Sequence, residues 1–136
     1  MSTTSFRSEH DLLGSLPVPK DAYYGIQTLR AMHNFNLSGV PLSHYPDFVS
    51  ALAMVKQAAA YANHQLGYLS DEKHAAITDA CHRISQGHHH DQFIVDMIQG
   101  GAGTSTNMNA NEVIANLALE FMGKEKGEYE YLHPNN

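Results

Sequence analysis

The chain has 136 residues and a mass of 15.0 kDa, a length that suits one compact domain. Hydrophobic residues make up 43% of it and charged residues 16%, which excludes a wholly disordered chain. The formal net charge of −6, with only 8 lysines and arginines, disfavours nucleic acid as a partner, because phosphates bind basic surfaces. No apolar run approaches the ~20 residues that cross a bilayer, so we expect no membrane partner either.

The cysteine content and the first residues indicate the compartment. Cys81 has no second cysteine with which to form a disulfide, as is usual in a reducing environment. Residues 1–9 lack the basic stretch followed by an apolar stretch that marks a secretory signal. We therefore expect a cytoplasmic protein.

The first predicted elements are an extended segment and a helix. Residues 6–19 contain a glycine and two prolines, which exclude a long helix and predict extended chain or a short hairpin. Asp21 is a suitable N-cap for a helix over residues 22–35, where apolar residues recur every three to four positions. Residues 36–44 include a glycine and a proline and should end that helix.

Two further helices should follow. Pro46 suits a first helical turn and Gly67 a C-terminal cap, so residues 46–66 predict a long helix. Ser70 should cap a third helix that ends at Gly87. Each helix carries an apolar stripe of the kind that packs on a core. The stripes are Phe48, Leu52, Val55, Ala59, Ala62 and Leu66 in the first, and Ile77, Ala80, Cys81 and Ile84 in the second.

The last predicted helix covers residues 105–122 and ends at Gly123, and a polar stretch follows it. No alternation of strands and helices is visible, so a parallel sheet is not expected. The sequence therefore predicts a mainly α fold with a short extended or hairpin element near the N-terminus.

Residues 100–109, GGAGTSTNMN, are the most informative segment for function. Three glycines in four residues let the backbone adopt positive φ and approach a ligand closely. Thr104 and Ser105 follow where the helix should begin, and the first amide groups of a helix can bind a carboxylate or a phosphate. A glycine-rich turn with an ordinary hydroxyl cap explains the same residues, so spacing alone leaves both interpretations open.

Other candidates carry weaker signals. The three residues His88–His90 point in diverging directions, so a polar surface loop is favoured over a metal site. Cys81 lies on an apolar stripe and is better explained as a small buried residue than as a nucleophile. Asn107, Asn111 and Glu112 fall near one helical face, which is either solvated or a hydrogen-bond network beneath a site.

Several of these segments resemble the aspartase/fumarase superfamily, from residue 7 to the end of the chain. The similar segments are DAYYGIQTLRA at 21–31, NF at 34–35, GTSTNMNANEVIAN at 103–116, KG at 126–127 and HPN at 133–135. The resemblance implies that residues 1–136 form the helical N-terminal domain of a three-domain lyase. The central helical bundle, which builds a homotetramer, and the C-terminal domain would then be absent from this chain.

Within the superfamily, fumarases typically have glutamine where this chain has Ser105, and residues 91–105 are instead similar to the aspartate ammonia-lyases. Those enzymes reversibly convert L-aspartate into fumarate and ammonia, and the resemblance implies no cofactor or metal ion. By this resemblance Thr104 should contact the substrate, while Ser105 and Gly103 should shape the loop. A fumarase or another lyase of the superfamily is the nearest alternative, and a non-catalytic binding module is an alternative of another class.

The resemblance also concerns the end of the chain and the residues that it lacks. His133, Asn135 and Asn136 match the start of a segment that forms a second, non-catalytic anion site in fumarases, although many relatives have aspartate at position 136. The family's base is a serine on a Gly-Ser-Ser loop, aided by a later lysine and asparagine, and these segments are not in this sequence. We therefore expect no catalytic residue within the chain and no activity from it alone.

Overall fold

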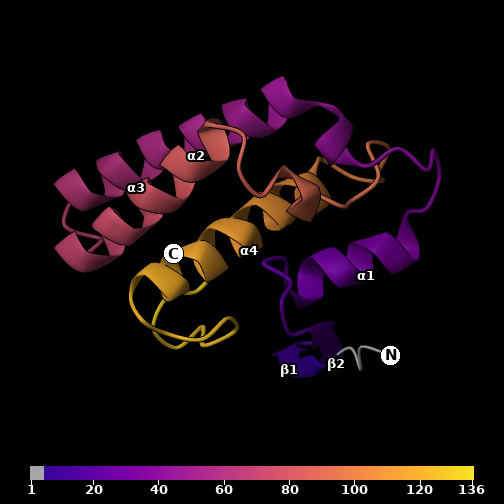
Figure 1. Ribbon diagram of the computed structural model, residues 1–136, viewed down its shortest axis with the longest axis horizontal. Helices are drawn as coiled ribbons and strands as arrows, with labels where there is room; N and C mark the ends of the chain where they lie inside the picture. Colours follow the sequence, from indigo (N-terminus) through magenta and orange to yellow (C-terminus); the bar gives the residue numbers. More distant parts are fainter. Residues whose placement is uncertain (1–4) are drawn as a thin grey trace.

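A two-stranded hairpin and four α-helices make up the part of the chain, residues 5–136, that the computed structural model describes (Figure 1). Helix α4 runs between α1 on one side and the α2–α3 pair on the other. This arrangement confirms the mainly α fold with a hairpin near the N-terminus. The elements are β1 (Phe6–Asp11), β2 (Gly14–Pro19), α1 (Ile26–Asn34), α2 (Pro46–Gln65), α3 (Asp71–Ser85) and α4 (Thr104–Phe121), with 3₁₀ turns at Leu42–His44 and His90–Gln92.

Strands β1 and β2 pair antiparallel, with Phe6 opposite Pro19 and Asp11 opposite Gly14. Leu12 and Leu13 form the tip of the hairpin, and both side chains are exposed. The hairpin is attached to α1 by an ion pair in which the Arg30 guanidinium meets the Asp11 carboxylate at 2.8 Å. This pair fixes the tip of the hairpin beside the first turns of α1.

Helix α1 begins at Ile26 rather than at Ala22, and the prediction that Asp21 caps it is wrong. The carbonyl groups that would start a helix at Ala22 are held by Arg7 instead. Its guanidinium donates to the carbonyl oxygens of Ala22 at 2.7 Å and Tyr24 at 2.9 Å, and also to those of Pro19 and Lys20. The chain therefore stays non-helical up to Gly25, whose extended backbone precedes the first turn.

Helices α2 and α3 form an antiparallel pair with the predicted boundaries to within two residues. Ser70 caps α3 as predicted, and the α3 stripe, including Cys81, is buried. The α2 stripe is on the wrong face: Phe48 is 46% exposed, Val55 64% and Leu66 69%. The buried residues of α2 are the smaller Val49, Ala53 and Ala60, because α3 packs closely against that side.

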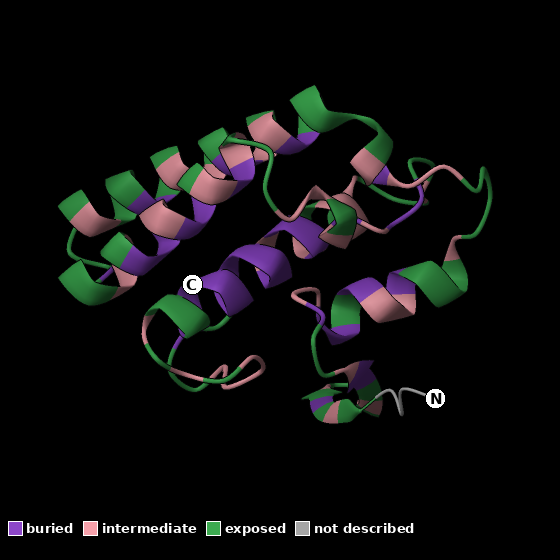
Figure 2. Ribbon diagram, viewed as in Figure 1, coloured by how far each residue is buried: buried purple, intermediate pink, exposed green. Residues whose placement is uncertain are grey.

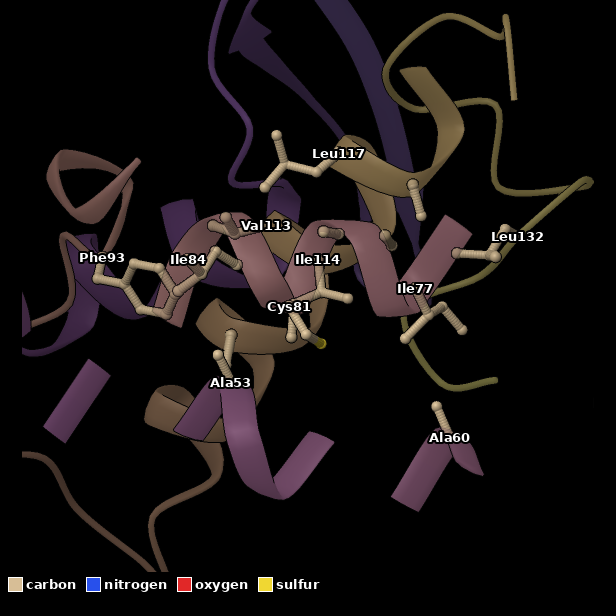
Figure 3. Close-up of a cluster of buried hydrophobic side chains, with 14 of the residues drawn as sticks. Ala53, Ala60, Ile77, Cys81, Ile84, Phe93, Val113, Ile114, Leu117 and Leu132 are labelled. Atoms are coloured by element: carbon tan, nitrogen blue, oxygen red, sulfur yellow. The ribbon is translucent and has the colours of Figure 1, made fainter. Parts of the chain in front are cut away.

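Helix α4 begins at Thr104 and ends at Phe121, close to the predicted bounds. It is buried on nearly all sides from Asn109 to Leu119, as Figure 2 shows. The core lies where α3 meets α4 (Figure 3). Its large members there include Ile77, Ile84, Phe93, Val113, Leu117 and Leu132. Within residues 5–136, no helix combines the length and the apolar character that crossing a membrane requires.

Candidate functional site

The N-terminus of α4 is open to a ligand. Gly101 and Gly103 have φ of +84° and +85°, the left-handed region that glycine enters without strain. The Gln99 side chain accepts from the amide of Thr106 at 3.1 Å and donates to its hydroxyl. The amide groups of Thr104 and Ser105 have no partner within residues 5–136. Two oriented donors with positive partial charge therefore remain free to bind an anion.

A cavity of about 670 Å³ opens beside this helix end, a size within the range of small-molecule sites. It brings together Thr104, His133 and Asn135, three of the residues singled out from the sequence. Ser105, Gly103 and Asn136 do not line it. The remaining lining residues come from the hairpin, α1, α4 and the C-terminal segment, and they are His10, Asp11, Leu12, Leu13, Ile26, Gln27, Met108, Glu112, Tyr129 and Pro134.

The segment His133–Asn136 is a compact turn held by its own side chains. The Asn136 Oδ1 accepts from the amide of His133 at 2.9 Å, and the His133 Nδ1 accepts from the amide of Asn135 at 3.1 Å. Asn136 lines a separate cavity of about 270 Å³ together with Lys56. The three residues of the expected second anion site are therefore neighbours, but His133 and Asn135 line both cavities whereas Asn136 lines only one.

A buried hydrogen-bond network lies beneath the larger cavity, and it includes Glu112, one of the three polar residues that the sequence places near one face. Glu112 is 1% exposed, and Asn109 and Asn116 on the same helix are also buried. Asn116 Nδ2 donates to the carbonyl of Tyr23 at 2.7 Å and to the hydroxyl of Tyr129 at 3.1 Å. Asn107 is exposed and Asn111 half-buried, so the polar face is a network only in part.

Two carboxyl groups from distant parts of the chain bind the N-terminus of α1. Glu9 on β1 accepts from the amide of Ile26 at 2.8 Å, and Glu112 on α4 accepts from the amide of Thr28 at 2.8 Å. An ideal Cβ on Gly25 would lie 1.8 Å from a Glu112 oxygen and 2.7 Å from a Glu9 oxygen. Glycine is required there because both carboxyl groups approach the backbone so closely.

The electrostatics of the cavity differ from one carboxyl group to the next. The Arg30 guanidinium holds the pKa of Asp11 below its usual value, so Asp11 is an ionised and paired group. Burial, together with the nearby Glu9 charge, raises the pKa of Glu112 to about 8 against the effect of its hydrogen bonds. Burial and the two neighbouring carboxyl groups also raise the pKa of Tyr129, which remains a phenol.

The loop before Gly100 is anchored by Asp96, whose side chain is a hydrogen-bond acceptor. It accepts from the amides of Ser38 at 2.8 Å, Gly39 at 3.0 Å and Ile98 at 2.8 Å, and from the Ser38 hydroxyl at 2.6 Å. Within residues 5–136, no three histidine, cysteine or acidic side chains are grouped to hold a metal ion. His90 instead bonds the carbonyl of Ile84 at 2.7 Å.

Sequence reasoning missed three residues that build the site: Glu9, Gly25 and Gln99. Glu9 and Gly25 meet segments that lie far away in the sequence, so no local spacing could reveal them. Gln99 stands seven residues before Thr106, and a polar side chain just before a glycine-rich turn was a signal that could have found it.

Comparison with known proteins adds a consistent set of similarities. A family described as "Lyase" matches residues 14–136. The aspartate ammonia-lyase of Pseudomonas aeruginosa is 75% identical over 132 residues, which cover 97% of this chain and 28% of that protein. The enzyme of the same name from Escherichia coli is 52% identical over 135 residues, 98% of this chain and 28% of its own length. The chain thus spans about 28% of the length of these curated relatives.

Solved structures show the same fold. The fumarate lyase:delta crystallin from Brucella melitensis in its native form superposes with a TM-score of 0.93 at 59% identity, over 95% of this chain and 29% of that one. A recombinant class II fumarase from Schistosoma mansoni superposes with a TM-score of 0.81 at 38% identity, over 90% of this chain and 26% of that one. Identity is therefore lower for this fumarase than for the aspartate ammonia-lyases.

Proposed function

This chain belongs to the lyase family, and we propose that residues 1–136 are the N-terminal domain of an aspartate ammonia-lyase. The whole protein would reversibly eliminate ammonia from L-aspartate to give fumarate. The identities of 75% and 52% to aspartate ammonia-lyases support this assignment over a fumarase, as does Ser105, where fumarases typically carry glutamine.

The single observation that carries the proposal is the open N-terminus of α4 at the rim of the 670 Å³ cavity. Elimination begins when a base removes a proton from the carbon beside a carboxylate, so negative charge develops on that carboxylate. The Thr104 hydroxyl and the free amides of Thr104 and Ser105 are donors that can meet this charge. Thr104 is therefore the proposed substrate contact, and Gly103 and Ser105 shape the loop that presents it.

His133, Asn135 and Asn136, at the C-terminal end of the chain, are proposed as a second, non-catalytic anion site. Their turn exposes a ring nitrogen and amide side chains, which can bind a carboxylate. His133 and Asn135 line the same cavity as Thr104, so a ligand there would lie close to the substrate.

The rest of the enzyme would be supplied by the parts that the relatives have beyond the matched 28%. We propose that those parts hold the catalytic base and build a homotetramer, so the chain alone is inactive. No cofactor is needed for this elimination. The buried free thiol of Cys81 supports a cytoplasmic location.

The test is the full-length protein assayed with L-aspartate and with malate, with fumarate followed by its ultraviolet absorbance. We expect fumarate from aspartate, and no fumarate from the 136-residue chain alone. Fumarate from malate but not from aspartate would establish the fumarase alternative, and no reaction with either would favour a binding module.

Thr104→Val tests the contact residue in the full-length protein, because it keeps the shape of the side chain and removes the hydroxyl. Removing one such donor should lower kcat/KM about 10²-fold. Thr78→Val is the matched control, since the Thr78 hydroxyl is buried, has no partner among residues 5–136 and does not line the cavity. Equal activity of the two variants would exclude Thr104 from transition-state binding.

A further inference from the structure

We propose that Glu112 is a positioning residue for the Thr104 site and that it acts as a neutral carboxylic acid beside Glu9, the carboxyl group that is paired with Arg7. Glu112 lies on α4 about two turns after Thr104, and both residues line the same cavity. Its effect on substrate rests on the proposed function, whereas its protonation and its hold on α1 do not.

The contacts of Glu112 tie α4 to the beginning of α1. Its Oε1 accepts from the Thr28 amide at 2.8 Å and from the Thr28 hydroxyl at 3.1 Å, and its Oε2 accepts from the Gln27 amide at 3.3 Å. These are the second and third amides of α1, which have no acceptor within that helix. Because α4 also carries Thr104 at its start, the position of the Thr104 donors depends on this connection.

Glu9, unlike Glu112, is paired with a cation and accepts from several donors. The Arg7 guanidinium lies 2.8 Å from Glu9 Oε1, and the Tyr129 hydroxyl donates to the same carboxylate at 3.1 Å. Glu112 has three hydrogen bonds, but no cation is among their donors. Both groups crowd the backbone of Gly25, where an added Cβ would touch an oxygen of each.

When two carboxyl groups lie this near to each other in a buried site, they cannot both be ionised. The group without a neighbouring cation therefore keeps the proton. The charged or titratable groups that face Glu112 are Glu9 from β1 and Tyr129 from the C-terminal segment. His10, Asp11 and His133 share the cavity with it. The raised pKa of Glu112, about 8, has the direction that this geometry requires.

The proton matters for ligand binding because Glu112 forms part of the cavity wall. A neutral acid there leaves the cavity able to accept a dicarboxylate, whereas an ionised Glu112 would repel one. If only the neutral state binds, the apparent affinity scales with the neutral fraction. Binding of a dicarboxylate should therefore weaken about tenfold between pH 7 and pH 9, given a pKa of about 8.

The experiment uses the full-length protein and succinate, a dicarboxylate without a group that titrates above pH 7, as a competitive inhibitor of aspartate elimination. In the wild type, the inhibition constant should rise about tenfold between pH 7 and pH 9. In Glu112→Gln, whose side chain is always neutral, it should stay within about twofold. Glu72→Gln, an exposed carboxylate at the start of α3, is the matched control and should behave as the wild type. A tenfold rise that persists in Glu112→Gln would overturn the proposal.

Two measurements separate this proposal from the proposed function. Infrared difference spectra of the wild type between pH 6 and pH 9 should show a protonated carboxyl group that ionises near pH 8, and its absence overturns the proposal even if the variant fails to fold. The second is denaturation at several pH values. The folded state holds the Glu112 proton more tightly than the unfolded chain, where the usual pKa of 4.5 applies.

The wild type should therefore lose stability relative to Glu112→Gln as the pH rises from about 4.5 to about 8, and the difference should be constant above that. If the full-length protein lacks lyase activity but shows both the infrared signal and the pH-dependent difference in stability, the proposed function is refuted. The proposal that Glu112 is a neutral acid beside Glu9 then still holds. A lyase whose wild type and variant share one pH profile of stability would refute the proposal about Glu112 alone.

Discussion

Replacing Gly25 with alanine tests whether the N-terminus of α1 depends on the close approach of two carboxyl groups. The added Cβ would lie 1.8 Å from Glu112 Oε2, 2.7 Å from Glu9 Oε2 and 2.6 Å from the Tyr129 hydroxyl, whereas ordinary contact begins at 3.4 Å. The φ of −123° is open to alanine, so the cost of this substitution is steric.

The loss of stability in Gly25→Ala can be worked out from the contacts that the added methyl group displaces. Glu112 must move away from Gly25, and it then leaves the three donors of Gln27 and Thr28 that it now binds. Each buried donor without an acceptor costs about 1–3 kcal/mol, and part of the set will find new partners as the site relaxes. We expect Gly25→Ala to lower the free energy of unfolding by about 3–5 kcal/mol, a large share of the ~5–15 kcal/mol of a typical domain.

Urea denaturation of the 136-residue chain, followed by far-ultraviolet circular dichroism, measures this cost. Gly14→Ala is the matched control, because its φ of +110° disfavours a side chain but no atom of the described part of the chain lies within 4 Å of the added Cβ. It should cost only about 1–2 kcal/mol.

Glu112→Ala vacates the space that the new methyl group would enter. The double variant with Gly25→Ala should therefore cost less than the sum of the two single changes, by at least about 1 kcal/mol. A Gly25→Ala cost no larger than that of Gly14→Ala, or strict additivity in the double variant, would refute the reasoning.

Two further predictions concern Cys81 and Asp96. Burial raises the pKa of the Cys81 thiol to about 12. A thiol reagent at pH 8 should therefore modify the folded chain at least 100-fold more slowly than the urea-unfolded chain. Similar rates of modification would contradict the burial of Cys81. The Ser38 hydroxyl, followed by the amides of Ile98, Ser38 and Gly39, holds the pKa of Asp96 below its usual 3.8. The stabilisation that Asp96 provides is fully present above pH 3.8 and is lost as the pH falls below that value. The melting temperature of Asp96→Asn should therefore fall less between pH 5 and pH 2 than that of the wild type. An equal fall in both proteins would contradict this role of Asp96.

Sequence patterns located the helices well but identified the buried face of only some of them. The α3 stripe was correct because α3 lies between α2 and α4, which together cover its apolar face. The α2 stripe was wrong because the larger residues, such as Val55, lie away from α3, while Ala53 and Ala60 allow the two helices to approach. Apolar periodicity measures which face is hydrophobic, and it does not say which partner covers that face.

The same limit explains the start of α1 and the candidate site. Asp21 was a reasonable cap by local rules, but Arg7, Glu9 and Glu112 bind backbone groups around the start of α1 from 15 to 84 positions away, a range that no local rule covers. The glycine-rich turn before Thr104 could be predicted because its backbone requirement is local. The cavity could not be, because it forms only where the hairpin, α1, α4 and the C-terminal turn meet.

The central position of α4 has a consequence for how the chain is made. The ribosome completes α1, α2 and α3 before α4, yet α1 packs chiefly on α4, and α3 packs on α4 as well as on α2. At about 5–20 residues per second, a nascent α2–α3 pair waits a few seconds for that helix. During this interval Ile77 and Ile84 are uncovered, and the growing polypeptide presents the kind of apolar surface that chaperones bind.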